Sequence, residues 1–422
     1  MNLLNKINIF IFCMISSCTI YSQTSTSSPY SRYGLGDLQA NIMSEYAGLG
    51  GGSTSAYHLK SINPYNAASY TAFGSKSFLF STGLSHQTTS MQKSDLNQIT
   101  NNTSLTHLIM GFPLSKKLGA SIGIIPFSNV GYEFSSNEIS SNNAANFIYS
   151  GDGGISKIYF GAAYEIIQGL SMGVNASYLF GGINRLKKVE FYDNTIFSTR
   201  SNTRTNLKGY NYEFGLIYNK NFVNNRQFTF GITANNDQNT IGAKQVHLVE
   251  TYELSGDFIN IKDTAVNSTF RGDAVLPRFF SLGATLRDGK KWLLTADYSI
   301  QNWSDYSIME TNDSLANSVR YSAGLQFTPD NQSLTSFVKR IRYRLGFSYS
   351  QTPLEINNIQ LEQRSITAGF GIPIRKNRTT YNVFIELGER GTVESNLIKE
   401  HFARFGVSFN FDSIWFVKQK YD

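Results

Sequence analysis

The residues that could carry catalysis or bind a metal are scattered along this 422-residue sequence. None of its histidines forms an i, i+4 pair, and none has carboxylates at the spacing of a metal site. These histidines are His58, His86, His107, His247 and His401. The only cysteines, Cys13 and Cys18, lie close to the N-terminus. We therefore expect no metal, no redox centre and no cofactor.

A glycine run at Gly48–Gly52 superficially resembles a phosphate-binding loop. A P-loop continues into Lys-Ser/Thr and a helix within a βαβ unit, and neither feature is present here. Glycines at this density instead indicate a sharp backbone turn. The sequence also lacks the Gly-x-Ser-x-Gly elbow on which a hydrolase triad is built. We expect a protein that is not an enzyme, and an acyl hydrolase is the alternative that stays open.

Three arginines are candidates for a binding role because they alternate with apolar neighbours on extended segments. Arg342 and Arg344 share one face of a segment, and Arg404 has the same facing on another. Such a row could guide an anionic head group, or it could pair with upstream carboxylates such as Asp37 and Glu45. Buried charges need partners, so we favour a salt-bridge network that holds the N-terminal segment.

The elements that position these side chains are strands. From about Ser77 to the C-terminus, apolar residues recur at every second position, as in Tyr343, Leu345, Phe347 and Tyr349. A period of two means extended strands with one apolar and one polar face. The expected strands are 77–90, 104–115, 119–134, 154–167, 169–191, 204–220, 226–252, 268–287, 290–306, 317–328, 339–351, 362–374, 378–389 and 401–417.

Composition and strand length indicate a membrane barrel rather than a row of soluble β-sandwiches. Only 16% of the residues are charged, compared with about a quarter in soluble proteins, and there are 24 Tyr and 31 Phe. The strands run to about nine residues or more, as a tilted strand needs to cross a bilayer. We therefore predict an all-β fold, a transmembrane antiparallel β-barrel of about fourteen strands in the bacterial outer membrane.

An even strand number places both ends of the barrel on the periplasmic side. The short links Ser115–Gly119 and Arg287–Lys290 are then periplasmic turns, and the second contains Asp-Gly, a hairpin signal. Polar stretches should extend outside the cell. They are 137–146, 193–206, 237–263 and 305–316.

The N-terminal part divides into two segments. Residues 1–22 resemble a secretory signal peptide, with Lys6 followed by the apolar run Ile7–Ile15. Residues 15–18 also resemble a lipoprotein box, which would leave Cys18 lipidated. We favour ordinary signal peptidase cleavage because barrels rarely need a lipid anchor. Residues 23–76 do not alternate and are expected to plug the lumen of the 77–422 barrel.

Three motifs follow one another along the mature chain. The first comprises residues 45–52 and 62–68. The second comprises residues 276–283 and continues to Trp303. The third comprises residues 343–349, Pro353 and residues 367–371. Their order and spacing resemble the fatty-acid-transporter family of outer-membrane barrels, a fourteen-stranded fold with an N-terminal hatch. Tyr65 stands where that family has a small residue. The resemblance implies that Gly50, Gly51, Gly52, Asn63 and Pro64 belong to a movable hatch.

The same resemblance implies two functions. The first is passage of hydrophobic small molecules across the outer membrane. The second is a role as a non-transporting structural or adaptor subunit of an outer-membrane secretion or assembly complex, since some members look like shuttle components of type IX secretion. Outer-membrane lipids are expected partners in either case. The net charge of +7 is not gathered in a basic block, so we expect no nucleic-acid partner.

Overall fold

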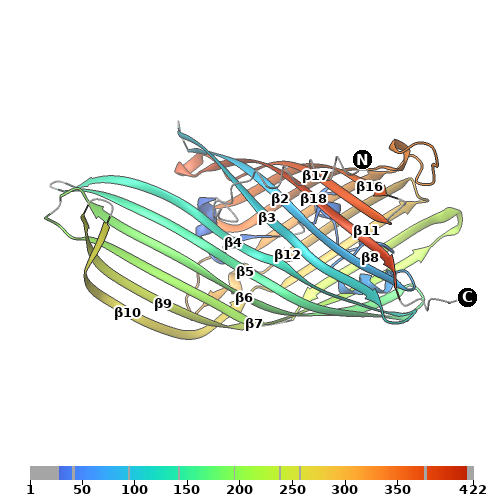
Figure 1. The fold of residues 1–422 in the computed structure, drawn as a ribbon, viewed down its shortest axis with the longest axis horizontal. Helices are drawn as coiled ribbons and strands as arrows, with labels where there is room; N and C mark the ends of the chain where they lie inside the picture. Colours follow the sequence, from blue (N-terminus) through green and yellow to red (C-terminus); the bar gives the residue numbers. More distant parts are fainter. Residues whose placement is uncertain are drawn as a thin grey trace, which may run out of the picture.

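The structure, a computed structural model, describes residues 28–39, 43–93, 96–140, 143–193, 195–236, 239–255, 258–374 and 378–415. Within these residues one antiparallel sheet closes on itself where β18 pairs with β2 (Figure 1). The expected signal peptide, including Cys18, lies outside the described residues.

The strands are β1 Asp37–Leu38, β2 Ser77–Lys93, β3 Leu96–Pro113, β4 Leu118–Ser140, β5 Asn143–Ile167, β6 Leu170–Phe191, β7 Ser198–Asn221, β8 Arg226–Asn235, β9 Asn239–Ser255, β10 Phe258–Leu276, β11 Phe279–Asp288, β12 Trp292–Gln301, β13 Ser307–Ile308, β14 Ser318–Phe327, β15 Arg342–Ile356, β16 Ile359–Ile374, β17 Thr379–Arg390 and β18 Lys399–Ile414. The helices are η1 Pro29–Arg32, α2 Ser44–Ala47, η2 Ala67–Ala72, η3 Val223–Asn225, η4 Trp303–Asp305, η5 Val338–Arg340 and η6 Glu394–Asn396.

The closed wall has fourteen strand positions among the described residues. β8 and β9 share one position because both pair with β7. β10 and β11 share the next position, where they pair with β9 and β8. The short strands β1 and β13 add no position of their own. The predicted fold class and strand number are confirmed.

The alternation in the sequence sorts side chains between lipid and lumen. On β15, Leu345 and Phe347 are 60% and 48% exposed, whereas Arg344 and Ser348 are 2% and 5% exposed. Each apolar side chain therefore faces outward, and each polar one faces the lumen, as expected for a strand with a period of two. No helix among the described residues is long and apolar enough to cross a membrane.

The two ends of the barrel differ in a way that orients it in the bacterial outer membrane. Ser77 and Ile414 pair with each other, so the barrel begins and ends at one rim. The short turns after β3 and β11 lie at this rim, as predicted. Short turns face the periplasm and longer extensions face the outside in such barrels, so this rim is periplasmic.

The extracellular side is lopsided (Figure 1). Strands β4 to β7 have 22 to 25 residues, whereas β11, β12 and β14 have ten each. The stretches 193–206 and 237–263, expected to extend outside the cell, are mostly strand, because β7 begins at Ser198 and β9 and β10 form a long hairpin. Most of the stretch 137–146 likewise belongs to strands β4 and β5. Hydrogen bonds to neighbouring strands keep these polar segments extended, although their sequence shows no alternating apolar pattern.

The wall is interrupted between β3 and β4. Their ladder covers only Leu108–Pro113 and Gly119–Ile124. Beyond it, the outer half of β3 pairs with β2 alone, and β4 continues along β5. β1 from the N-terminal segment occupies part of the β4 edge, pairing with Ser128 and Asn129. The outer-leaflet half of the barrel therefore has a break in its hydrogen-bonded wall.

Candidate functional site

The lumen is filled at two levels by N-terminal residues. Residues 43–73, here called the plug, pack near the periplasmic rim in an apolar cluster with wall residues such as Ile109 and Tyr159. Residues 28–39, here called the strap, cross the extracellular half in a second apolar cluster with Val130 and Leu179. Two separate cores thus hold one chain segment inside the barrel.

The plug is anchored by a buried ion pair. Glu45 on α2 lies 3.7 Å from Arg344, and both side chains are almost completely buried. The carboxylate of Glu45 also accepts hydrogen bonds from the Ser61 hydroxyl and, at 2.9 Å, from the Asn410 amide. Burial by itself raises the pKa of Glu45, but the nearby guanidinium groups, Arg344 foremost, outweigh it and leave this pKa below its usual range. Glu45 is therefore a carboxylate at neutral pH.

The remaining contacts of Arg344 are neutral. It donates hydrogen bonds of 2.9 Å to Gln326 and to Asn382. The predicted pairing of lumen arginines with plug carboxylates holds for this residue. Arg342 lies on the same face but makes no ion pair with a described residue. Asp37, the other carboxylate considered from the sequence, pairs with Arg390 instead.

The glycine turn of the plug lies directly against the wall. Gly50 has φ +71°, and a Cβ there would come within 2.5 Å of the carbonyl oxygen of Phe347. Its N–H donates to Thr367, and its carbonyl accepts from Arg320. Gly346 faces it across the contact with no side chain of its own. Only glycine fits this approach of two backbones.

The rest of this region is braced internally. The Asn63 amide donates to the carbonyls of Ser53 and Ala56, which closes a tight loop. The Pro64 carbonyl accepts from Asn175 on the wall. Gly51 and Gly52 continue the turn, and the N–H groups of Ser53 and Thr54 both donate to Asp297 at 2.7 Å. The five residues expected in a hatch thus lie in one plug held by wall polar groups.

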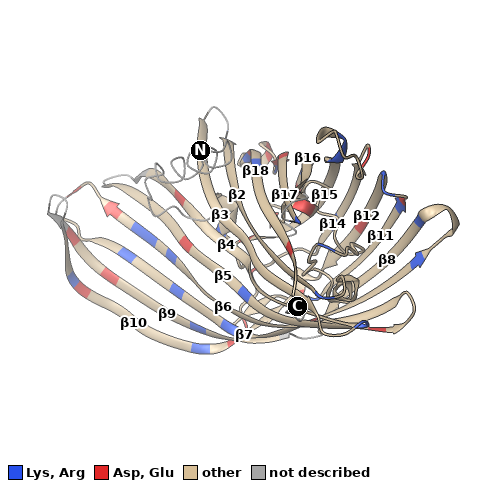
Figure 2. Cartoon of the chain, turned by 45° about the vertical axis from the view of Figure 1, so that its right-hand side comes forward, with Lys and Arg blue, Asp and Glu red and all other residues tan. Residues whose placement is uncertain are grey.

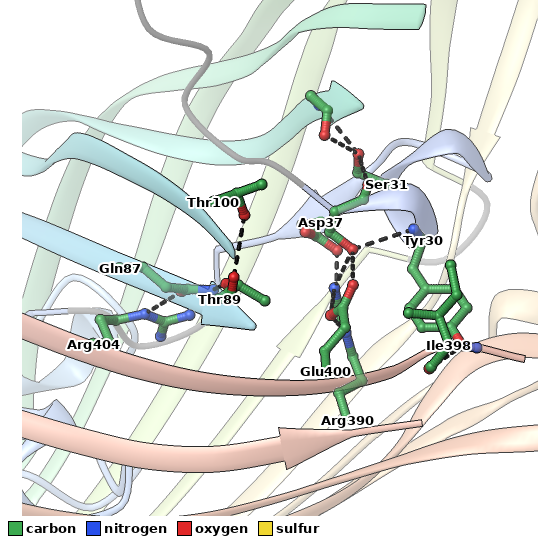
Figure 3. Close-up of polar contacts among 12 residues, drawn as sticks. Tyr30, Ser31, Asp37, Gln87, Thr89, Thr100, Arg390, Ile398, Glu400 and Arg404 are labelled. Atoms are coloured by element: carbon green, nitrogen blue, oxygen red, sulfur yellow. Dashed lines mark hydrogen bonds and ion pairs between the residues drawn. The ribbon is translucent and has the colours of Figure 1, made fainter. Parts of the chain in front are cut away.

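The strap is anchored by a second set of charges, which the sequence did not reveal (Figure 3). Arg390 on β17 lies 2.8 Å from Asp37 and 2.7 Å from Glu400, and it donates to the Ser28 hydroxyl at 2.6 Å. The Tyr30 hydroxyl donates to the carbonyl of Ile398. Arg390 and Glu400 are cross-strand partners, so opposite charges flanking one predicted hairpin were the available signal.

The strap is also tied to β4. Besides the β1 ladder, the Ser28 N–H donates to the Gly131 carbonyl and the Gln39 N–H donates to the Phe127 carbonyl. Arg32 lies over the rings of Phe134 and Tyr149, at 5.9 and 5.0 Å. The strap therefore spans the mouth from β4 to β17 and covers the lumen below it.

A cavity of about 350 Å³ lies between the strap and the plug. Its lining includes nine charged side chains, namely Asp37, Lys157, Glu213, Asp297, Arg320, Glu386, Arg390, Glu400 and Arg404. Arg404, one of the predicted lumen arginines, pairs with Glu386 at 3.1 Å. Arg404 and Arg344 thus belong to different layers and form no common site.

The cavity reaches the break in the wall. Asn102 and Ser104, from the half of β3 that does not pair with β4, line it, and so do Ile125 and Phe127 from β4. Among the described residues no group of three or more His, Cys, Asp or Glu could hold a metal ion. The arrangement can therefore accommodate a small molecule between a polar interior and the bilayer.

Comparison with known proteins gives one family and one fold. The family model described as BamG matches residues 3–422. No curated protein matches the chain in sequence. Among solved structures, the Pseudomonas putida toluene transporter TodX is similar at 15% identity and a TM-score of 0.58, covering 90% of this chain and 100% of that one.

Two further structures are similar to a comparable degree. The Ralstonia pickettii toluene transporter TbuX has 13% identity, a TM-score of 0.56 and coverage of 88% of this chain and 98% of its own. A Pseudomonas aeruginosa FadL homologue has 10% identity, a TM-score of 0.59 and coverage of 87% and 97%. At these identities the likeness shows the fold, and the expected resemblance to fatty-acid-transporter barrels is confirmed.

Proposed function

The chain belongs to the BamG family, and from its plugged barrel we propose that it is a non-enzymatic outer-membrane channel through which small molecules with a hydrophobic portion pass. The observation that carries this proposal is the cavity bordered by the break between β3 and β4. Because β3 and β4 do not pair with each other at the level of the outer leaflet, an apolar molecule has a sideways path to the bilayer. The toluene transporters with the same fold suggest this class of cargo.

The lining of the cavity indicates which kind of small molecule could be transported. Nine charged side chains make it a poor environment for a molecule that is apolar throughout, because their desolvation would not be compensated. A molecule with a polar end and a hydrocarbon part satisfies both regions. Its polar end would lie among the charged groups, and its hydrocarbon part would leave between β3 and β4.

The strap must move for such a molecule to enter from outside, and a disulfide can test this. The mature sequence after the expected leader has no cysteine. Leu38 and Ser128 are direct partners across the β1–β4 ladder, at a separation that suits a disulfide. In Leu38→Cys/Ser128→Cys, oxidation locks the strap to the wall. Thr199→Cys/Thr251→Cys is the matched control, because it links two strands that stay paired and neither residue lines the cavity.

Uptake of radiolabelled laurate and toluene would be measured in cells whose own copy of the protein is deleted. We expect the wild type to accelerate uptake of laurate more than that of toluene. The oxidised strap lock should abolish the acceleration, reduction should restore it, and the control disulfide should leave it unchanged. Uptake no faster than in the deletion strain, or a lock without effect, would refute the channel.

A second candidate function, a docking subunit of an outer-membrane complex, is favoured by the free edge of β10. Among the described residues, β10 pairs outside its ladder with β9 only at Ala274 and Val275, with β13. Ile261, Val266 and Phe270 are exposed along it. Such an edge can accept a strand from another protein. Ile261→Lys/Val266→Lys should then release a co-purifying outer-membrane protein without changing uptake, whereas an unchanged complex would contradict this role.

A further inference from the structure

Four cations stand on the outer face of the barrel just above its aromatic belt. On β7, Tyr210 and Tyr212 face outward with 66% and 43% exposure, and Lys208 follows on the same face. Arg204 faces outward four residues farther from the membrane. Lys244 on β9 and Arg271 on β10 complete the group, here called the cation patch. Figure 2 shows blue bands close together on β7, β9 and β10 at this level.

The strand register brings these charges together. Lys244 is the direct partner of Arg271 across the β9–β10 ladder, and its other partner is Asn206 on β7. Asn206 lies between Arg204 and Lys208 along the same face. Side chains directly opposite on adjacent strands are about 5 Å apart at Cβ, and like charges in such a pair destabilise the sheet. The Lys244–Arg271 pair is therefore favourable only with an anion beside it.

The protein supplies few anions here. None of the four cations makes an ion pair with a described residue. Asp273 lies opposite Gly242 at the lower edge of the patch, and Asp152 lies two strands away, where its carboxylate accepts from Asn184. Four positive charges and two peripheral negative ones leave an excess of +2 at the surface.

The surface beside the patch is hollowed. A depression on the outer face is lined by Asp152, Gly182, Asn184, Asn202 and Arg204. Gly182 has no side chain, which leaves room between β5 and β7. A bulky anionic group can therefore approach Arg204 closely and still reach the neighbouring cations.

We propose that the cation patch binds the phosphate groups of a phosphorylated glycolipid in the outer leaflet. The height of the patch selects this ligand. Hydrocarbon chains pack against the belt that ends at Tyr210, and the head group then meets Lys208 and, one row farther out, Lys244 and Arg271. A soluble anion would gain nothing from the apolar surface below. The site lies on the outside of the wall and is independent of transport through the lumen.

Binding of bisphosphorylated lipid A by the purified protein would be compared with binding of the same lipid after phosphatase treatment. The triple variant Lys208→Gln/Lys244→Gln/Arg271→Gln should bind the phosphorylated form about a hundredfold more weakly, since each cation at an anionic lipid surface contributes about fivefold. The control Lys116→Gln/Lys290→Gln/Lys291→Gln removes the same charge from the exposed periplasmic turns. It should bind like the wild type.

Three results would overturn the proposal. They are equal binding of the two lipid forms by the wild type, unchanged binding by the triple variant, and full displacement of lipid A by inorganic phosphate, which would show a site for soluble anions. Retained heat-modifiable gel mobility verifies folding of each variant. If the triple variant does not fold, Arg271→Gln alone should lower affinity about fivefold, and unchanged affinity would equally refute the site.

Discussion

Removing Arg344 should release the plug while leaving the barrel wall intact. Arg344→Met eliminates the 3.7 Å ion pair with Glu45 and two hydrogen bonds to wall amides. It leaves a carboxylate inside the lumen whose remaining hydrogen-bond partners, among the described residues, are the Ser61 hydroxyl and the Asn410 amide. Breaking a buried pair in this way costs about 3–5 kcal/mol.

Glu45→Gln should cost less. The glutamine oxygen can still accept from Asn410, and Arg344 keeps its two neutral acceptors, so the expected cost is about 1–3 kcal/mol. In the double variant no unpaired charge remains. Its cost should therefore fall short of the sum of the single costs by about 0.5–3 kcal/mol, the range found for residues in one network.

A cysteine at Ala47, which is 6% exposed beside this pair, reports the opening of the plug by its rate of maleimide labelling. When opening is a rapid pre-equilibrium, the rate follows the free energy of opening. Arg344→Met should therefore accelerate labelling about a hundredfold or more, at about tenfold per 1.4 kcal/mol. Unchanged labelling, or strictly additive effects in the double variant, would refute the view that this pair anchors the plug.

Three further outcomes follow from the structure. Because the pKa of Glu45 is lowered in the folded state, its contribution is complete above its ordinary value of 4.5 and is lost as the pH falls below it. Labelling of the Ala47→Cys reporter should therefore accelerate below about pH 4 and should lose this pH dependence in Glu45→Gln. In urea titrations, Phe347→Arg on the lipid face should cost about 2–4 kcal/mol of folding free energy. Ser350→Arg, whose side chain extends into the cavity, should cost much less. Equal costs would contradict the assigned facing. Gly346→Ala should push the Gly50 turn away and raise ion conductance in planar bilayers, whereas Gly242→Ala, whose added Cβ has only one neighbour at 3.4 Å, should not.

The strands were predictable because the residue types along each strand depend on the lipid or polar surroundings of that strand alone. An outward residue meets lipid and an inward one meets polar groups, so a period of two appears wherever a strand crosses the bilayer. β15 was located in this way, and so was the inward facing of Arg344. The outer part of β10, residues 259–267, was not predicted as a strand, because its residues are exposed to water on both faces. Its extended form depends on backbone hydrogen bonds to a neighbouring strand, and such bonds produce no periodic pattern in the sequence.

The lumen contacts required the closed barrel. The pairing of Glu45 with Arg344 was among the sequence hypotheses, since a buried carboxylate needs a cation. The sequence offered the same reason for pairing Asp37 with Arg342, and the structure places Asp37 beside Arg390 instead. Several arginines could equally well provide the cation that a buried carboxylate needs. Only the path of the strap across the mouth brings one of them within reach.

The sequence by itself determined the barrel, its number of strands and the face that each side chain presents, because these follow from interactions between neighbouring residues and the solvent beside them. The tertiary structure decided the two-level filling of the lumen, the break between β3 and β4 and the gathering of Lys208, Lys244 and Arg271 on one outer patch. Each of these joins residues far apart in the chain. Their proximity depends on strand register and on closure of the sheet, which no local pattern records.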